Sequence, residues 1–209
     1  MKANSLTSLI FHELLGKEVL PNQEAFLNEV APIVADFKHD FLEPPSSTAV
    51  ALSVACNKNL YDTLSNSMGL WGDNHFIFSK VIRQWRSGDY PARIAGLGHP
   101  KFKGADPRTV EIEQLAARHV IDVHSLASFK EVAHQKQLHV NLAGCLGLIL
   151  WDMGFDEDNV DFFPMVWRLI GLTKLYGVLN GEIKLGAGID CIKKAYNLIY
   201  PNRYDNTST

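Results

Sequence analysis

Cysteine is scarce in this sequence, which has only three in 209 residues: Cys56, Cys145 and Cys191. Their number is odd, they lie far apart, and apolar residues surround them, which favours buried thiols over disulfides or a metal site. We therefore expect buried thiols and no metal site.

An excess of charge of one sign is also lacking, because 20 lysines and arginines face 23 aspartates and glutamates, for a net charge of -3. No basic stripe or polybasic run occurs, which argues against a nucleic-acid partner and against an anionic membrane surface. No uninterrupted apolar run reaches the length of a membrane span, and residues 1–19 lack the apolar core and cleavage site of a secretory signal. These absences predict a cytoplasmic protein without a membrane partner.

Alternating strand patterns are scarce too, whereas apolar residues recur at helical spacing along most of the chain. The pattern predicts an all-α protein with short connections, built as one domain over residues 1–204 with a loose tail over 205–209. The expected helical segments are 7–16, 21–37, 47–56, 59–70, 76–85, 109–119, 125–135, 140–153, 161–180 and 189–199.

The most informative segment is residues 96–108, which reads GLGHPKFKGADPR. A flexible glycine turn carries the imidazole of His99 and the ammonium groups of Lys101 and Lys103, and Asp106-Pro107 then restarts the chain so that Arg108 falls in the first turn of a helix. Such a loop is suited to anions, with arginine taking a carboxylate and lysines meeting phosphate oxygens. The alternative is an ordinary basic loop whose arginine braces helices through a carboxylate such as Glu111 or Asp152.

This Gly-x-Gly-His…Asp-Pro-Arg string resembles that of the citrate synthase and citryl-CoA lyase family. Further resemblances follow in the family's order, from about Ser8 to Glu182, at 41–49 (FLEPPSSTA), 60–72, 141–155 (NLAG…LWDMGF) and 167–172 (WRLIGL). The resemblance implies a compact helical fold with a large lobe and a small lobe, the latter roughly over 73–170. It also implies a homodimer.

The resemblance further implies site residues. Gap-free counting from Gly72 places His75 on a catalytic histidine, and His99 is the second. Arg108 and Arg168 would bind substrate carboxylates. The expected contacts to coenzyme A are Leu97, Gly98, Lys101 and Lys103. No covalently bound cofactor is expected, and a coenzyme A thioester would be a substrate.

Two departures from the family bear on activity. Ala143 stands where the family has the aspartate that abstracts a proton, and a shifted register would supply only the amide of Asn141. The string Asn159–Phe162 spells the family's Asn-Val-Asp-Phe but lies too close to Arg168. Phe76-Ile77-Phe78 replaces the family's Gly-Gly-Ala and should narrow the acyl pocket.

Other titratable groups that could replace the base are Asp73 and His139, although a turn aspartate and an exposed loop histidine explain them as well, and Asp152 should serve packing. Three functions stay open. The first is a divergent carbon-carbon lyase or acyltransferase that acts on a carboxylate-bearing acyl-CoA or oxo acid. The second is a pseudoenzyme that serves as a ligand-binding or noncatalytic partner subunit, and the third is an interaction module with a collapsed pocket.

Overall fold

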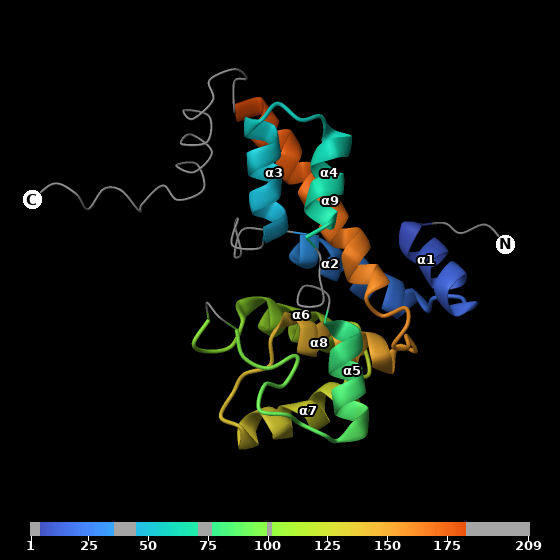
Figure 1. Ribbon diagram of the computed structural model, residues 1–209. Coiled ribbons are helices and arrows are strands. Elements are labelled where there is room, and N and C mark those ends of the chain that lie inside the picture. The colour runs from blue at the N-terminus through green and yellow to red at the C-terminus, as the bar shows by residue number, and fades with distance from the viewer. Residues whose placement is uncertain (1–4, 36–44, 71–76, 100–101, 183–209) are drawn as a thin grey trace, which may run out of the picture. The chain divides into compact units, whose positions relative to one another are not determined.

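The structure is a computed structural model in which residues 5–35, 45–70, 77–99 and 102–182 are described (Figure 1). Within those ranges the chain forms nine helices and one isolated β-bridge, and the predicted all-α fold is confirmed. The helices are α1 (Leu6–Leu15), α2 (Pro21–Ala35), α3 (Pro45–Ala55), α4 (Leu60–Met68), α5 (Phe78–Ser87), α6 (Pro107–Arg118), α7 (His124–Gln135), α8 (Leu142–Asp152) and α9 (Phe162–Glu182). The helix expected over 189–199 lies outside the described residues.

The chain divides into two compact units, one formed by residues 1–33 and 73–166 and the other by residues 34–72 and 167–209. The second unit pairs α3 with α4 and has its own apolar core. That core consists of Val50, Ala51, Val54, Leu172, Leu175 and Leu179. The expected division into a large lobe and a small lobe over 73–170 stays a prediction.

In the first unit α8 is the central helix, because α5, α6 and α7 all pack against it. Its residues from Gly144 to Leu150 are buried on every side, which explains why this helix is apolar all round rather than amphipathic. Three phenylalanines form a second cluster of edge-to-face rings in the same unit: Phe11, Phe155 and Phe163. The buried helix fixes the loops at both of its ends.

Side chains that bind free N–H groups determine where several helices begin. Asp106 caps α6 and Asn141 caps α8 from the adjacent position in sequence. Asp161 lies 83 residues after Phe78 in the sequence, yet its Oδ1 accepts the N–H of Phe78 at 3.0 Å. This cap explains why α5 begins at Phe78 and not at the expected residue 76, which lies outside the described part.

Helix α9 is long and apolar enough to cross a membrane, although Arg168 and Lys174 interrupt its apolar residues, so it is not an uninterrupted apolar run. Its segment Phe162–Gly181 has 20 residues and a mean hydropathy of 1.2. A core helix of a soluble protein meets the same criterion, and Leu172, Leu175 and Leu179 of this helix belong to the core of the second unit.

The expectation of three buried thiols is wrong for one cysteine. Cys145 is buried in α8, but Cys56 is exposed. The physical reason is the end of α3, where Asn57 takes a positive φ of 62° and the chain turns toward solvent. Cys191 lies outside the described residues.

Candidate functional site

The glycine loop is held against the start of α8 by close backbone contact. Gly96 has a φ of 86°, and a methyl group at Gly144 would meet the Gly96 carbonyl oxygen at 2.4 Å. The Asn141 N–H donates to that same oxygen, and its side-chain amide donates to the Gly98 oxygen at 2.8 Å. An antiparallel bridge between Leu97 and Val140 completes the junction.

Asn141 therefore has a structural task. Its Oδ1 accepts the N–H groups of Ala143 at 3.0 Å and Gly144 at 3.1 Å while its Nδ2 holds the loop. The same residue caps a helix and anchors the glycine turn, so its amide positions the site rather than acting on a proton.

Arg108 lies in the first turn of α6, as predicted, but its carboxylate partner is Asp106. Its Nη2 donates to Asp106 Oδ2 at 2.7 Å, and its Nε donates to Oδ1 at 3.0 Å. Both side chains are almost fully buried, with exposures of 4% and 1%. A bidentate pair of this kind fixes the plane of the guanidinium.

His99 stands beside this pair. Its Nε2 lies 3.5 Å from Arg108 Nη2, and its ring lies 4.6 Å from the ring of Phe102 between centroids. The backbone N–H of Phe102 donates to His99 Nδ1 at 3.3 Å, and the other ring nitrogen, Nε2, faces Arg108 Nη2, which can only donate. These two contacts hold the imidazole between the loop backbone and the guanidinium.

Phe102 is the member of this site that the sequence analysis missed. Its ring contacts His99 and lies 6.0 Å from the Arg108 guanidinium carbon. The sequence did contain a feature that could have identified Phe102: it is an aromatic residue between two lysines in a polar loop. Such a residue often packs on the charged groups around it.

The structure brings together only part of the predicted set. Leu97 and Gly98 are half-buried in the loop and Lys103 is exposed, while His75 and Lys101 lie outside the described residues. The Gly98 N–H donates to the His139 carbonyl at 2.8 Å, so it secures the loop. Arg168 lies on α9 in the other unit, and its convergence with Arg108 stays a prediction.

Ala143 is the second residue of α8 and is half-buried next to the glycine loop. Asp161 of the Asn-Val-Asp-Phe string caps α5. Asp152, which was expected to serve packing, accepts the Ser125 N–H at the start of α7 at 3.0 Å. His139 is exposed, as expected, and Asp73 lies outside the described residues.

Phe78 is one of the residues expected to narrow an acyl pocket. It is 5% exposed, and its ring packs against α8, where a methyl group at Gly147 would meet its Cδ1 at 3.3 Å. Phe78 thus belongs to the core between α5 and α8. The pocket hypothesis then depends on Ile77, which is half-buried, and on Phe76, which lies outside the described residues.

A separate cleft of about 410 Å³ lies between α2 and α6. Its lining contains none of the predicted site residues and consists of Asn28, Glu29, Pro32, Glu111, Gln114, Leu115 and Arg118.

Comparisons with known proteins bear on the fold. No protein-family model matches the sequence, and no curated protein matches it either. Among solved structures, citryl-CoA lyase from Hydrogenobacter thermophilus is similar with a TM-score of 0.70 and 20% identity, over 83% of this chain and 75% of that chain.

Two further solved structures have a fold similar to that of this chain. A Methanosaeta concilii ATP citrate lyase variant in complex with (3S)-citryl-CoA has a TM-score of 0.71 and 19% identity, over 85% of this chain and 34% of that one. Citrate synthase from Thermoplasma acidophilum, in a complex with carboxymethyl coenzyme A and oxaloacetate, has a TM-score of 0.57 and 16% identity, over 85% of this chain and 53% of that one. At these identities the likeness concerns the fold, and it confirms the fold that the sequence motifs predicted.

Proposed function

From the citrate synthase-like fold of this chain, we propose that it binds a carboxylate-bearing acyl-CoA or oxo acid at the loop over residues 96–108. The observation that carries the proposal is the buried pair of Arg108 and Asp106 beside His99. A guanidinium whose plane is fixed before the ligand arrives loses little freedom on binding a carboxylate.

The roles of the individual groups follow from their chemistry. His99 forms a hydrogen bond with a carbonyl or hydroxyl of the ligand, and Arg108 attracts its carboxylate. Lys103, which is exposed, meets phosphate oxygens of a coenzyme A moiety. His75, Lys101 and Arg168 would complete the site, as the family resemblance implies.

The proposal includes the loss of the usual general base. With Ala143 at the second position of α8, no group there accepts the proton that an acetyl methyl must lose, and such a loss typically costs about 10²–10⁴-fold in rate. A divergent lyase or transferase would need another base.

A pseudoenzyme that binds the ligand as a noncatalytic partner is the second candidate. One observation favours it: Asp152 and Asp161, two carboxylates of the same unit, are both engaged at helix starts. Neither is placed to serve as a substitute base.

Calorimetric titration with oxaloacetate, citrate, coenzyme A and acetyl-CoA tests the binding site. We expect Arg108→Ala to weaken carboxylate binding by about 1.5–3 kcal/mol, the range for a hydrogen bond to a charged group. Arg118→Ala is the matched control, because Arg118 is an exposed arginine at the other end of α6. Equal effects of both substitutions, or binding that neither one changes, would remove the assignment.

A turnover assay then separates the two candidates. We expect no citrate formation from acetyl-CoA and oxaloacetate by the wild-type protein. Ala143→Asp restores a carboxylate at a position where the helix dipole tolerates a negative charge, and turnover by this variant would show that only the base is missing. Clear turnover by the wild-type protein would contradict the loss of the base.

A further inference from the structure

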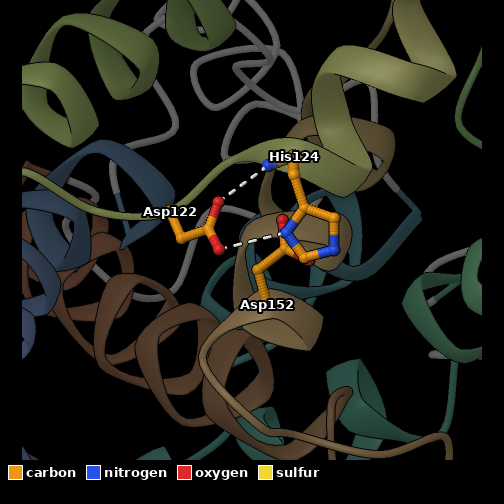
Figure 2. Close-up of side chains that lie close together, drawn as sticks. All are labelled: Asp122, His124 and Asp152. Carbon is orange, nitrogen blue, oxygen red and sulfur yellow. Dashed lines mark hydrogen bonds and ion pairs between the residues drawn. The ribbon is translucent and has the colours of Figure 1, made fainter.

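Three potential metal ligands meet at the end of α8 opposite the glycine loop. Asp122 belongs to the connection between α6 and α7, His124 is the first residue of α7, and Asp152 is the last residue of α8 (Figure 2). One ligand atom from each lies within 4.8 Å of the other two. The helical rise puts Asp152 about 14 Å along the axis from Ala143, so this cluster is distinct from the proposed ligand site.

The imidazole of His124 lies next to both carboxylates. Its Nδ1 is 3.1 Å from Asp122 Oδ2, and its Nε2 is 3.3 Å from Asp152 Oδ1. Two ligands bound to one tetrahedral ion at about 2.0 Å lie about 3.3 Å apart, which is the separation of Nε2 and the Asp152 oxygen. The side chains of Asp122 and His124 are 68% and 66% exposed, so the Asp122 carboxylate has room to turn toward the same ion.

Asp152 has the environment of a pre-organised ligand. Its side chain is fully buried. The Ser125 N–H donates to Oδ2 at 3.0 Å and its hydroxyl donates to Oδ1, so both oxygens are oriented. Outer hydrogen bonds of this kind orient the ligands of metal sites.

Within the described part of the chain, the ion pairs of Asp122 and Asp152 stay inside the cluster. Among the described residues, the ion-pair partner of Asp122 and of Asp152 is His124 alone, and no lysine or arginine pairs with either. Two carboxylates and one imidazole form a donor set that suits a divalent transition-metal ion.

We propose that Asp122, His124 and Asp152 bind one divalent transition-metal ion, with water in the remaining positions. One imidazole nitrogen with two carboxylate oxygens suits zinc, cobalt or manganese better than calcium or magnesium, which take oxygen ligands. The ion would tie the connection before α7 to the end of α8. From the sequence we expected no metal site, because the three cysteines lie far apart among apolar residues. The proposed ligands include no cysteine, so that argument does not apply to them.

Cobalt(II) is the probe, added alone to the full-length protein from which any affinity tag has been removed. We expect saturable visible absorption with one equivalent bound and a rise in the melting temperature of the protein. Zinc(II) should displace the cobalt and abolish the absorption, because zinc has no d–d transitions.

His124→Ala and Asp152→Asn each should raise the dissociation constant for cobalt at least about tenfold. The compared quantity is the gain in melting temperature on adding cobalt, so a loss of stability without metal does not mimic the effect. His134→Ala is the matched control, because His134 is an exposed histidine at the other end of α7, and it should bind cobalt as the wild type does. Binding that survives in both cluster variants, or that Cys56→Ser abolishes, would overturn the proposal.

Discussion

At the scale of single residues, the buried pair of Asp106 and Arg108 makes the start of α6 depend on two charges that are both removed from water. Each charge is tolerated there because the other compensates it. Removing one partner is therefore costly, whereas a similar change in an exposed pair is not.

Asp106→Asn tests this dependence, since asparagine still caps the helix but has no charge. We expect the free energy of unfolding to fall by about 3–5 kcal/mol, the cost of leaving a buried charge without its partner. Urea denaturation measures the change. Glu29→Gln is the control, because Glu29 forms an exposed pair with Arg118 and should lose no more than about 1 kcal/mol.

The cysteines give a second prediction at this scale. Burial raises the pKa of the Cys145 thiol far above its ordinary value, so its reactive thiolate is scarce at pH 8. Because the thiol is buried, an alkylating reagent also cannot reach it. In the folded protein, iodoacetamide should label Cys56 and leave Cys145 unmodified, as peptide mass spectrometry would show. Labelling of Cys145 before unfolding would contradict its placement in the core.

Contacts between residues that lie close in the sequence could be predicted. Contacts between residues that only the fold brings together could not. His99 and Arg108 are nine positions apart in one motif, and the structure places them side by side. The family resemblance led us to interpret Asp152 as a packing residue. Nothing in the sequence shows that its carboxylate reaches a helix start 27 residues earlier. The exposure of Cys56 was missed for a similar reason, since apolar neighbours do not reveal where a helix ends.

At the scale of elements, the contact of the glycine loop with α8 allows no side chain at Gly144, where a methyl group would lie 2.4 Å from a backbone oxygen. A backbone atom cannot move aside as a flexible side chain can. The loop and the helix would therefore have to separate.

Gly144→Ala should destabilise the protein by about 1–3 kcal/mol or more, the cost of overpacking a core, and should also weaken ligand binding at the loop. Thermal unfolding and calorimetry measure the two effects. Gly177→Ala is the control: Gly177 is exposed in α9 and has open space around it, so alanine there should add about 0.5–1 kcal/mol of stability. A neutral Gly144→Ala would show that the loop is not held in this way.

Helix positions were predictable from apolar spacing and local caps, which act over three or four residues. The starts of α6 and α8 follow this rule, because Asp106 and Asn141 stand directly before them. The start of α5 does not, because its cap comes from Asp161. The sequence offered Asp161 as part of a catalytic string, and its structural role became visible only with the fold.

At the scale of the whole molecule, the predicted homodimer concerns the second unit. The segment Ser47–Leu70 was expected to supply the contact. It contains most of α3 and all of α4, and both helices expose apolar side chains. These are Leu52, Leu60, Tyr61 and Met68, followed by Leu70. Exposed apolar groups on neighbouring helices suit close packing against a second copy.

We expect sedimentation analysis to show a dimer and Tyr61→Glu to shift it toward monomer. Tyr61 is 79% exposed, so a charge there should leave the fold of one chain unchanged. Leu20→Glu is the control, because Leu20 is exposed and belongs to the first unit. A strictly monomeric wild-type protein would refute the prediction.

The distant cap of α5 also has a consequence for synthesis on the ribosome. The N–H groups of Phe78 and Ser79 leave the exit tunnel 83 and 82 residues before Asp161, which accepts both in the folded chain. At about 5–20 residues per second, that delay is roughly 4–17 s. During this interval the nascent segment holds an uncapped helix start and an uncovered apolar face, so it is the stage at which a chaperone would be most useful to this chain.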